Sequence, residues 1–172
     1  MTERVSLRPV SEEDLPVLLK LTQDPEATGE FEGFGWYAPR LFRRGWEDNG
    51  LIGPDGGILI AICRDEIIGA VNWRRHVTAP ASHCWELGIG LLPEARGHGY
   101  GTETHRLVVR YLFAHTTVYR IEAATEAGNT AEQRALEKTG FRREGVRRGI
   151  RWRDGAWRDE VLYSILRTDP PE

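Results

Sequence analysis

Cysteine, methionine and long apolar runs are scarce in this chain. It has two cysteines and one methionine in 172 residues. Cys63 and Cys84 fall in strand-like segments, and their spacing is not that of a metal site or a disulfide framework, so we predict two reduced core thiols. No uninterrupted apolar run is long enough to span a bilayer. The first ten residues also lack the basic-then-apolar layout of a signal peptide, and we expect a cytoplasmic protein.

Positive charge is not in excess either. The chain has 23 Lys and Arg residues against 26 Asp and Glu residues, which gives a formal net charge of −3. This balance argues against general binding to nucleic acids or anionic membranes. No group of His, Cys and Asp residues has metal-ligand spacing, and Ser, His and Asp are too scattered for a hydrolase triad. We therefore predict no metal, no nucleic-acid partner and no membrane partner.

The sequence does contain a regular series of amphipathic segments. Its length suits one domain with a substantial core, and we expect residues 1–172 to form that domain. Apolar periodicity, caps and turn signals predict strands at 5–9, 58–64, 67–77, 85–92, 119–126, 141–152 and 156–166. Helices are predicted at 12–23, 39–48 and 131–139, with a long central helix after residue 101. This order predicts an α/β fold, a mixed sheet with helices on both sides.

A glycine-rich segment joins the strand at 85–92 to the central helix. Pro93 ends the strand, and Arg96-Gly97-His98-Gly99-Tyr100-Gly101 follows directly before the helical pattern. Backbone N–H groups in such a turn are unpaired, and together with the helix dipole they form an anion site. Thr102 and Glu103 after Gly101 exclude both a Walker loop and a dinucleotide fingerprint. A tight turn without a ligand is the alternative.

The combination Leu-x-Pro followed by Arg-x-x-Gly-x-Gly resembles the pyrophosphate loop of the GCN5-related N-acetyltransferases (GNAT). The resemblance implies a mixed, mostly antiparallel sheet and acetyl-coenzyme A as the co-substrate. It also implies that backbone groups of the preceding strand pair with the pantetheine arm. The cofactor-binding residues expected on this basis are Ile89, Leu91, Arg96, Gly97, His98, Gly99, Gly101 and Thr102.

A second pattern, from Asn129 through Glu137-Lys138 to Gly140-Phe141, is similar to the RimJ/RimL-like branch of that family. In this branch the Asn contacts the pantetheine arm, which implies the same for Asn129; a helix cap is the structural alternative. Two positions depart from the family. Glu132 stands where the branch commonly has a Ser that stabilises the leaving thiolate, and Leu136 stands where other branches have a Tyr as general acid.

The resemblance implies an N-acetyltransferase that moves an acetyl group to a primary amine, either a protein N-terminus or a small molecule, by direct attack. The two departures keep a non-catalytic acyl-CoA-binding or sensor protein open as the alternative. The branch and the frequency of symmetric dimers also suggest a homodimer.

Acetyl transfer needs a neutral amine, so a carboxylate base, direct or through water, would help. Glu122 is the first candidate, because it resembles the strand glutamate assigned as base in some N-terminal acetyltransferases. Glu86, on the strand at 85–92, is the second. Either could instead be a solvent-facing sheet residue, because alternation does not fix the face. Tyr163, His76 and His83 have no positional support.

The segment 28–38 mixes glycines, aromatic rings and acids. Glu30, Phe34 and Trp36 are the candidate substrate-binding residues, and Glu32 and Tyr37 accompany them. A loop that presents rings and carboxylates together would suit a cationic amine. The alternative is that the rings pack the underside of the loop.

Overall fold

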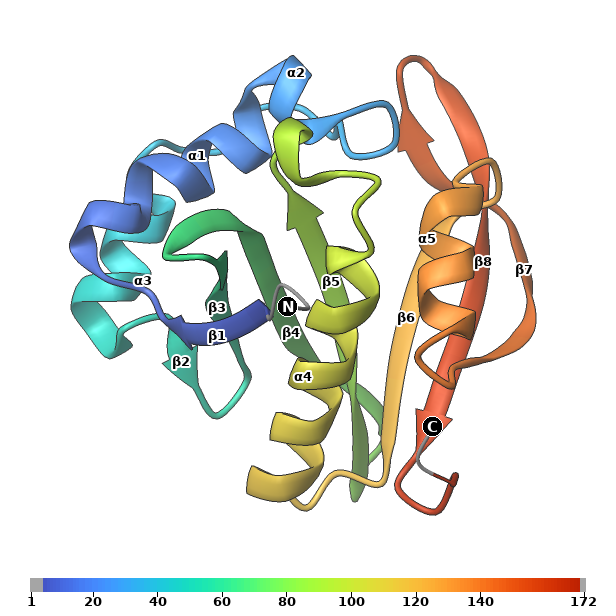
Figure 1. Ribbon diagram of the computed structural model, residues 1–172. Coiled ribbons are helices and arrows are strands. Elements are labelled where there is room, and N and C mark those ends of the chain that lie inside the picture. Colours follow the sequence, from blue (N-terminus) through green and yellow to red (C-terminus); the bar gives the residue numbers. More distant parts are fainter. Residues whose placement is uncertain (1–4, 171–172) are drawn as a thin grey trace.

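A twisted sheet forms the centre of the protein in the computed structural model, which describes residues 5–170 (Figure 1). The sheet has eight strands in the order β1-β3-β4-β5-β6-β8-β7, with the short β2 paired to β3. The strands are β1 Val5–Pro9, β2 Ile52–Gly53, β3 Gly56–Cys63, β4 Glu66–Ala79, β5 Ser82–Leu91, β6 Arg120–Glu126, β7 Arg142–Arg153 and β8 Ala156–Leu166. The ends of the predicted 1–172 domain, residues 1–4 and 171–172, lie outside the described part.

Helices cover both faces of this sheet. They are α1 Leu15–Gln23, α2 Pro25–Thr28, α3 Leu41–Asn49, α4 Tyr100–His115 and α5 Thr130–Glu137, with short 3-10 turns at Glu12–Asp14 and Pro93–Ala95. None of the described helices is long and apolar enough to cross a membrane.

The alternation of side chains along the strands divides the core between the two faces. Leu59 and Val71 pack in the core beneath α4, together with Leu112 of that helix. Their strand neighbours Ile60 and Ala70 belong to the opposite core, which contains residues of α1 and α3. The predicted fold class, a mixed and mostly antiparallel sheet with helices on both sides, is confirmed.

The strands β5 and β6 are parallel neighbours that pair over only a short stretch. Trp85, Glu86 and Leu87 pair with Ile121, Glu122 and Ala123, and the pairing then stops. From Gly88 to Leu91, β5 pairs with β4 alone. The other edge of this segment therefore offers backbone groups that the described sheet does not use.

The β7–β8 hairpin forms one edge of the sheet, with β7 outermost (Figure 1). Asp154 and Gly155 turn the chain with φ values of 49° and 72°, as a two-residue hairpin turn requires. In β7 the register slips between Arg147 and Arg151, and the Gly149 N–H donates to Asp159 Oδ1 at 2.8 Å. This bulge displaces the middle of β7 from a regular ladder.

Candidate active site

The predicted anion loop lies at the start of α4. Gly97 and Gly99 have φ values of 80° and 83°, and a Cβ added at either would meet no atom within 4 Å. These two glycines are therefore required by the backbone conformation, and the space beside them is open. Gly99 occupies the N-cap position of α4, and no side chain accepts a hydrogen bond there, so the start of the helix is uncapped. The N–H groups of Gly101 and Thr102, in the first helical turn, can therefore donate hydrogen bonds to a ligand.

Arg96 and His98 of the loop have structural contacts of their own. The guanidinium of Arg96 donates from Nε to the Leu91 carbonyl at 3.0 Å and from Nη2 to the Ala27 carbonyl. It thereby joins the loop to the end of β5 and to α2. The ring of His98 stacks on Tyr100 with centroids 5.6 Å apart. Arg96 is placed to hold the loop in shape rather than to reach outward.

The second predicted contact point, Asn129, begins α5. Its Oδ1 accepts from the Glu132 N–H at 3.2 Å, and its Nδ2 donates to Thr125 Oγ1 at 3.0 Å. Asn129 is thus a helix cap. The Glu132 carboxylate lies 2.7 Å from Nε2 of the buried His105. The partner of Glu132 is therefore a residue of α4. Leu136 is fully buried in the core.

A cleft of about 480 Å³ runs along the free edge of β5, on the face that α1 and α3 cover. Its floor includes Gly88, Ile89 and Gly90 of β5 and Ala124 of β6. The polar side chains that line it are Thr22, Thr28, Glu32, Tyr37, Asn72, Arg74, Glu86 and Arg151. The short β5–β6 pairing therefore opens directly into a cavity with carboxylate, guanidinium, amide and hydroxyl groups.

Glu32 is the carboxylate in this cleft whose pKa is raised. Desolvation by nearby protein atoms raises its pKa to about 7, and the neighbouring charges of Glu132 and Glu160 act in the same direction. Arg151 and Arg153 oppose the shift. By surface area Glu32 is nevertheless exposed, so its raised pKa reflects the surrounding protein atoms and charges and not exclusion of the side chain from water, and protons can exchange with solvent. A carboxyl group with this pKa changes its charge near neutral pH.

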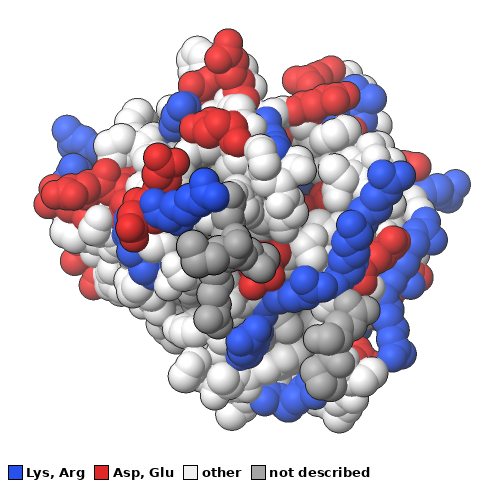
Figure 2. All heavy atoms as spheres, in the orientation of Figure 1, with Lys and Arg blue, Asp and Glu red and all other residues white. Residues whose placement is uncertain are grey.

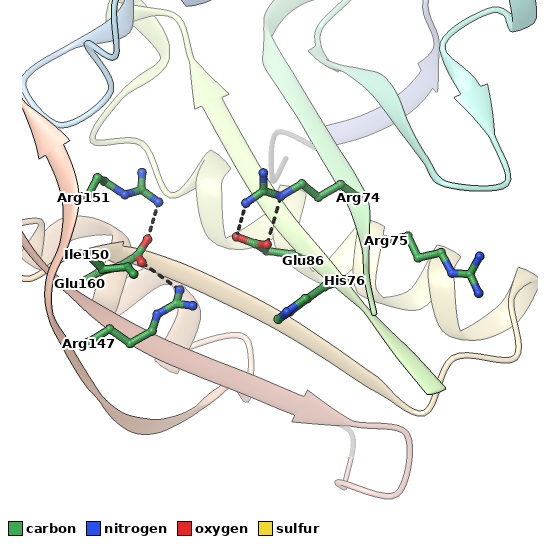
Figure 3. A pocket seen from close by; sticks show the side chains of 8 residues that line it. All are labelled: Arg74, Arg75, His76, Glu86, Arg147, Ile150, Arg151 and Glu160. Atoms are coloured by element: carbon green, nitrogen blue, oxygen red, sulfur yellow. Dashed lines mark hydrogen bonds and ion pairs between the residues drawn. The ribbon is translucent and has the colours of Figure 1, made fainter. Parts of the chain in front are cut away.

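A second cleft, of about 440 Å³, adjoins the first and is rich in arginine (Figure 3). Arg74, Arg75, Arg147 and Arg151 line it together with His76, Glu86, Ile150 and Glu160. Glu160 lies between two of the arginines and accepts from Arg147 at 2.8 Å and from Arg151. The bulge in β7 places Ile150 and Arg151 here, and Arg151 also lies 4.8 Å from the ring centroid of Phe34.

Of the two predicted bases, only Glu86 lines the clefts. Arg74 binds its two carboxylate oxygens at 2.9 and 3.0 Å. Burial would raise the pKa of Glu86, but the hydrogen bonds and charge of Arg74 outweigh it, so the pKa lies below its usual value. Glu122 pairs with Glu86 across the strands but does not line either cleft. Its carboxylate accepts from Arg120 Nε at 2.7 Å and lies 3.4 Å from His76 Nδ1.

Only one of the three residues predicted to bind the acceptor lines the cleft. Phe34 lines the cleft beside Arg151. Glu30 and Trp36 do not line it, and Trp36 is 94% exposed. Tyr163 is buried, and its hydroxyl donates to Glu137 Oε1 at 2.9 Å, away from the cleft. The sequence analysis missed Asn72, Arg74 and Arg151, which have no motif and reach the site only through strand register and the bulge in β7.

The charge on the α4 and α5 face is uneven. Figure 2 shows a band of Lys and Arg side chains over the region where Figure 1 places α4, α5 and β7. Asp and Glu side chains gather mainly at the top and left of the same view. A chain of net charge −3 thus presents a cationic surface beside the uncapped start of α4, and such a surface attracts anionic ligands.

Comparison with known proteins identifies the family. The chain matches the model of the acetyltransferase (GNAT) domain over residues 4–142. This chain belongs to the GNAT family. It is 34% identical over 105 residues to the probable N-acetyltransferase YjcK of Bacillus subtilis, covering 61% of this chain and 58% of that protein. It is 30% identical over 104 residues to the ribosomal protein uS5-alanine N-acetyltransferase of Escherichia coli, covering 60% of this chain and 53% of that protein.

The fold of this GNAT chain is similar to that of Mycobacterium smegmatis RimJ in complex with CoA-disulfide. The TM-score is 0.76 at 22% identity, and the match covers 98% of this chain and 84% of the other. The family predicted from the sequence is confirmed, and proteins of the RimJ/RimL-like kind are among those that the chain resembles. The aligned segments span little more than half the length of the two curated relatives.

Proposed function

We propose that this GNAT protein transfers the acetyl group of acetyl-coenzyme A to the α-amino group of a peptide or protein. The observation that carries the proposal is the unpaired edge of β5 at Gly88–Leu91, which leads from the uncapped start of α4 to the cleft of Glu32 and Glu86. The relative that acetylates an alanine of ribosomal protein uS5 supports a protein acceptor.

Backbone groups at the start of α4 and along the edge of β5 would bind coenzyme A, which is anionic and extended. The N–H groups of Gly101 and Thr102, with the α4 dipole, would bind the pyrophosphate. The open backbone edge of Ile89 and Leu91 would pair with the pantetheine arm. Free N–H groups of the same edge would polarise the thioester carbonyl in the manner of an oxyanion hole. Arg96 would hold the loop, and Asn129 would fix the start of α5.

The chemical step is direct attack. The amine nitrogen bonds to the carbonyl carbon, the C–S bond breaks, and the departing thiolate takes a proton from solvent. The amine proton passes to a carboxylate, directly or through a water. We assign this role to Glu32, because it lines the cleft and its pKa of about 7 suits a base at neutral pH. Glu86, held by Arg74, would orient the acceptor.

An α-amino acceptor suits such a base better than a lysine or polyamine. Deprotonating an α-amino group at pH 7 costs roughly 1.4 kcal/mol, whereas a lysine-like amine costs roughly 4.6 kcal/mol. Arg74 and Arg151 in the cleft also make it less favourable for a purely cationic acceptor than Glu30 and Glu32 suggested from the sequence.

Thiol release from acetyl-coenzyme A tests the function. Short peptides with free N-termini, their N-terminally blocked counterparts, polyamines and other small amines form the acceptor panel, and coenzyme A binding is measured in parallel. We expect release with free peptides and none with blocked ones. Release only with polyamines would overturn the acceptor assignment. Binding without release from any acceptor would support a sensor instead.

Replacing Gly99 with alanine tests the loop. A side chain at φ 83° costs roughly 1–2 kcal/mol, which is lost from the binding-competent loop. We expect a coenzyme A dissociation constant about 5–30 times higher, measured by calorimetry. Gly145→Ala is the matched control, because its Cβ would also meet nothing within 4 Å and it lies on β7. Equal affinity of both variants and the wild type would exclude the loop as the binding site.

A further inference from the structure

Three side chains able to bind a metal meet on three adjacent strands, outside the acetyl-transfer cleft. They are His76 on β4, Cys84 on β5 and Glu122 on β6, and their ligand atoms all lie within 4.8 Å of one another. His76 and Cys84 are direct partners in the antiparallel β4–β5 pair. Glu122 is the parallel partner of Glu86, two residues along β5 from Cys84. Strand register therefore assembles the group.

Two of the three separations between the ligand atoms are close to those that a tetrahedral zinc ion imposes, and the third is at most 4.8 Å. Cys84 Sγ lies 3.8 Å from His76 Nδ1, and the same nitrogen lies 3.4 Å from Glu122 Oε2. With ordinary zinc bond lengths, tetrahedral angles place sulfur and nitrogen about 3.5 Å apart and nitrogen and oxygen about 3.4 Å apart. Binding of an ion would require Cys84 Sγ and Glu122 Oε2, which lie within 4.8 Å of each other, to approach to about 3.5 Å.

One oxygen of the Glu122 carboxylate is left available to a cation. Arg120 holds Oε1 of Glu122 at 2.7 Å and leaves Oε2 toward His76. The positive charge of Arg120 is itself neutralised by Glu144, which it contacts at 2.8 and 2.5 Å. The Glu122 carboxylate and a Cys84 thiolate would then supply the two negative charges that balance a divalent ion.

An ion would reach this group of three side chains from the side where His76 is exposed. The side chain of His76 is 47% exposed and that of Glu122 only 10%, and Cys84 is buried. His76 also lines the arginine-rich cleft, where its ring points to the opposite side of β4 from Arg75 (Figure 3). An ion entering past this ring would find the other two ligands already in place. The burial of Cys84 makes the alternative of a reactive thiol nucleophile a poor fit.

We propose that Cys84 Sγ, His76 Nδ1 and Glu122 Oε2 form a binding site for zinc or a similar thiophilic divalent cation, with water as the fourth ligand. Binding forms the metal–sulfur bond and releases the thiol proton to solvent. The ion would link β4, β5 and β6 where β5 and β6 pair. The site is independent of the proposed acetyl transfer, because none of the three ligands is assigned a role in that reaction.

Cobalt(II) is the probe, because its spectrum reports its ligands. Adding cobalt chloride to the reduced, metal-free protein should produce a thiolate-to-cobalt charge-transfer band in the near ultraviolet and strong visible bands of tetrahedral coordination. Zinc should abolish both by displacement. Absence of the charge-transfer band from the wild-type protein would overturn the proposal.

Matched variants locate the site. Cys84→Ser should lose the charge-transfer band, and His76→Asn and Glu122→Gln should weaken cobalt binding about 100-fold or more. Cys63→Ser and His83→Asn should bind like the wild type, since Cys63 lies in a separate core cluster with Val5 and Ala61 and the ring of His83 packs against Trp85. Loss of the band in Cys63→Ser, or its retention in Cys84→Ser, would contradict the assignment.

Thermal unfolding gives a second readout that does not depend on the spectrum. A ligand that binds only the folded chain raises its unfolding temperature. Zinc should therefore raise the unfolding temperature of the wild type and of Cys63→Ser, and leave that of Cys84→Ser unchanged. Circular dichroism of each metal-free variant establishes that it is folded before titration. An equal increase in all three proteins would indicate binding elsewhere and overturn the proposal.

Discussion

Replacing Glu32 with glutamine is expected to lower kcat/KM for acetyl transfer about 10²–10⁴-fold, the contribution typical of a positioned general base. The amide keeps the size of the side chain but cannot accept the amine proton. Steady-state thiol release with a free peptide acceptor measures the loss. Coenzyme A affinity should be unchanged, because Glu32 lies in the cleft on the α1 and α3 face and not in the loop at the start of α4.

The dependence of kcat/KM on pH also tests the role of Glu32. Glu32 has a pKa raised to about 7, so it is ionised and able to accept a proton above that pH and is protonated below it. The kcat/KM of the wild type should therefore rise with pH up to about 7 and then level, apart from the titration of the acceptor itself. The Glu32→Gln profile should lack this inflection.

Two further variants make the assignment falsifiable. Glu30→Gln changes an exposed acid of the same loop that does not line the cleft, and should retain wild-type rates. Glu122→Gln tests the glutamate that the sequence favoured. If Glu122→Gln slows the reaction with recovery at high pH while Glu32→Gln does not, Glu122 is the base and our assignment is wrong.

Replacing Arg153 with methionine is expected to lower the free energy of unfolding by about 3 kcal/mol, because it leaves a buried carboxylate without its partner. Arg153 donates from Nε and Nη2 to the two oxygens of Glu126 at 2.8 and 2.9 Å, and both residues are 7% exposed. The value is at the low end for buried pairs because Arg153 also contacts the exposed Asp154, which places the pair near water. Urea unfolding measures the change.

The pH dependence of this loss follows from Glu126. Hydrogen bonds and the charge of Arg153 lower the pKa of Glu126 below its usual value, although burial opposes them. The resulting stabilisation is fully present above the ordinary glutamate pKa, about 4.3, and is lost as the pH falls toward the folded value. The difference between wild type and Arg153→Met should therefore shrink in acid.

The double variant Arg153→Met with Glu126→Leu separates pairing from packing. Apolar replacement of both partners is often neutral, so much of the lost stability should return. The exposed pair of Arg43 and Glu12 serves as the comparison, and Arg43→Met should produce no measurable change. A double variant no more stable than Arg153→Met would show that the arginine acts through its packing and not through the ion pair.

The local sequence was enough to predict the parts of this protein whose chemistry lies within a short segment. The loop from Arg96 to Gly101 could be recognised because the left-handed conformations at Gly97 and Gly99 require glycine and the helix start follows at once. The hairpin turn at Asp154 and Gly155, and the cap at Asn129, are local in the same way. Element order then led to the correct fold class, and the motif of the loop led to the family.

The tertiary structure alone decided the contents of the site. Alternation along a strand does not state which face is buried or which residue of the next strand lies opposite, because register depends on long-range pairing. Register placed Glu86 in the clefts, and turned Glu122 toward Arg120 and His76. The bulge in β7 brought Arg151 to Phe34, and the atoms and charges of distant segments beside the exposed Glu32 raised its pKa. His76, Cys84 and Glu122 met for the same reason: no spacing along the chain relates them, and only the pairing of β4, β5 and β6 does.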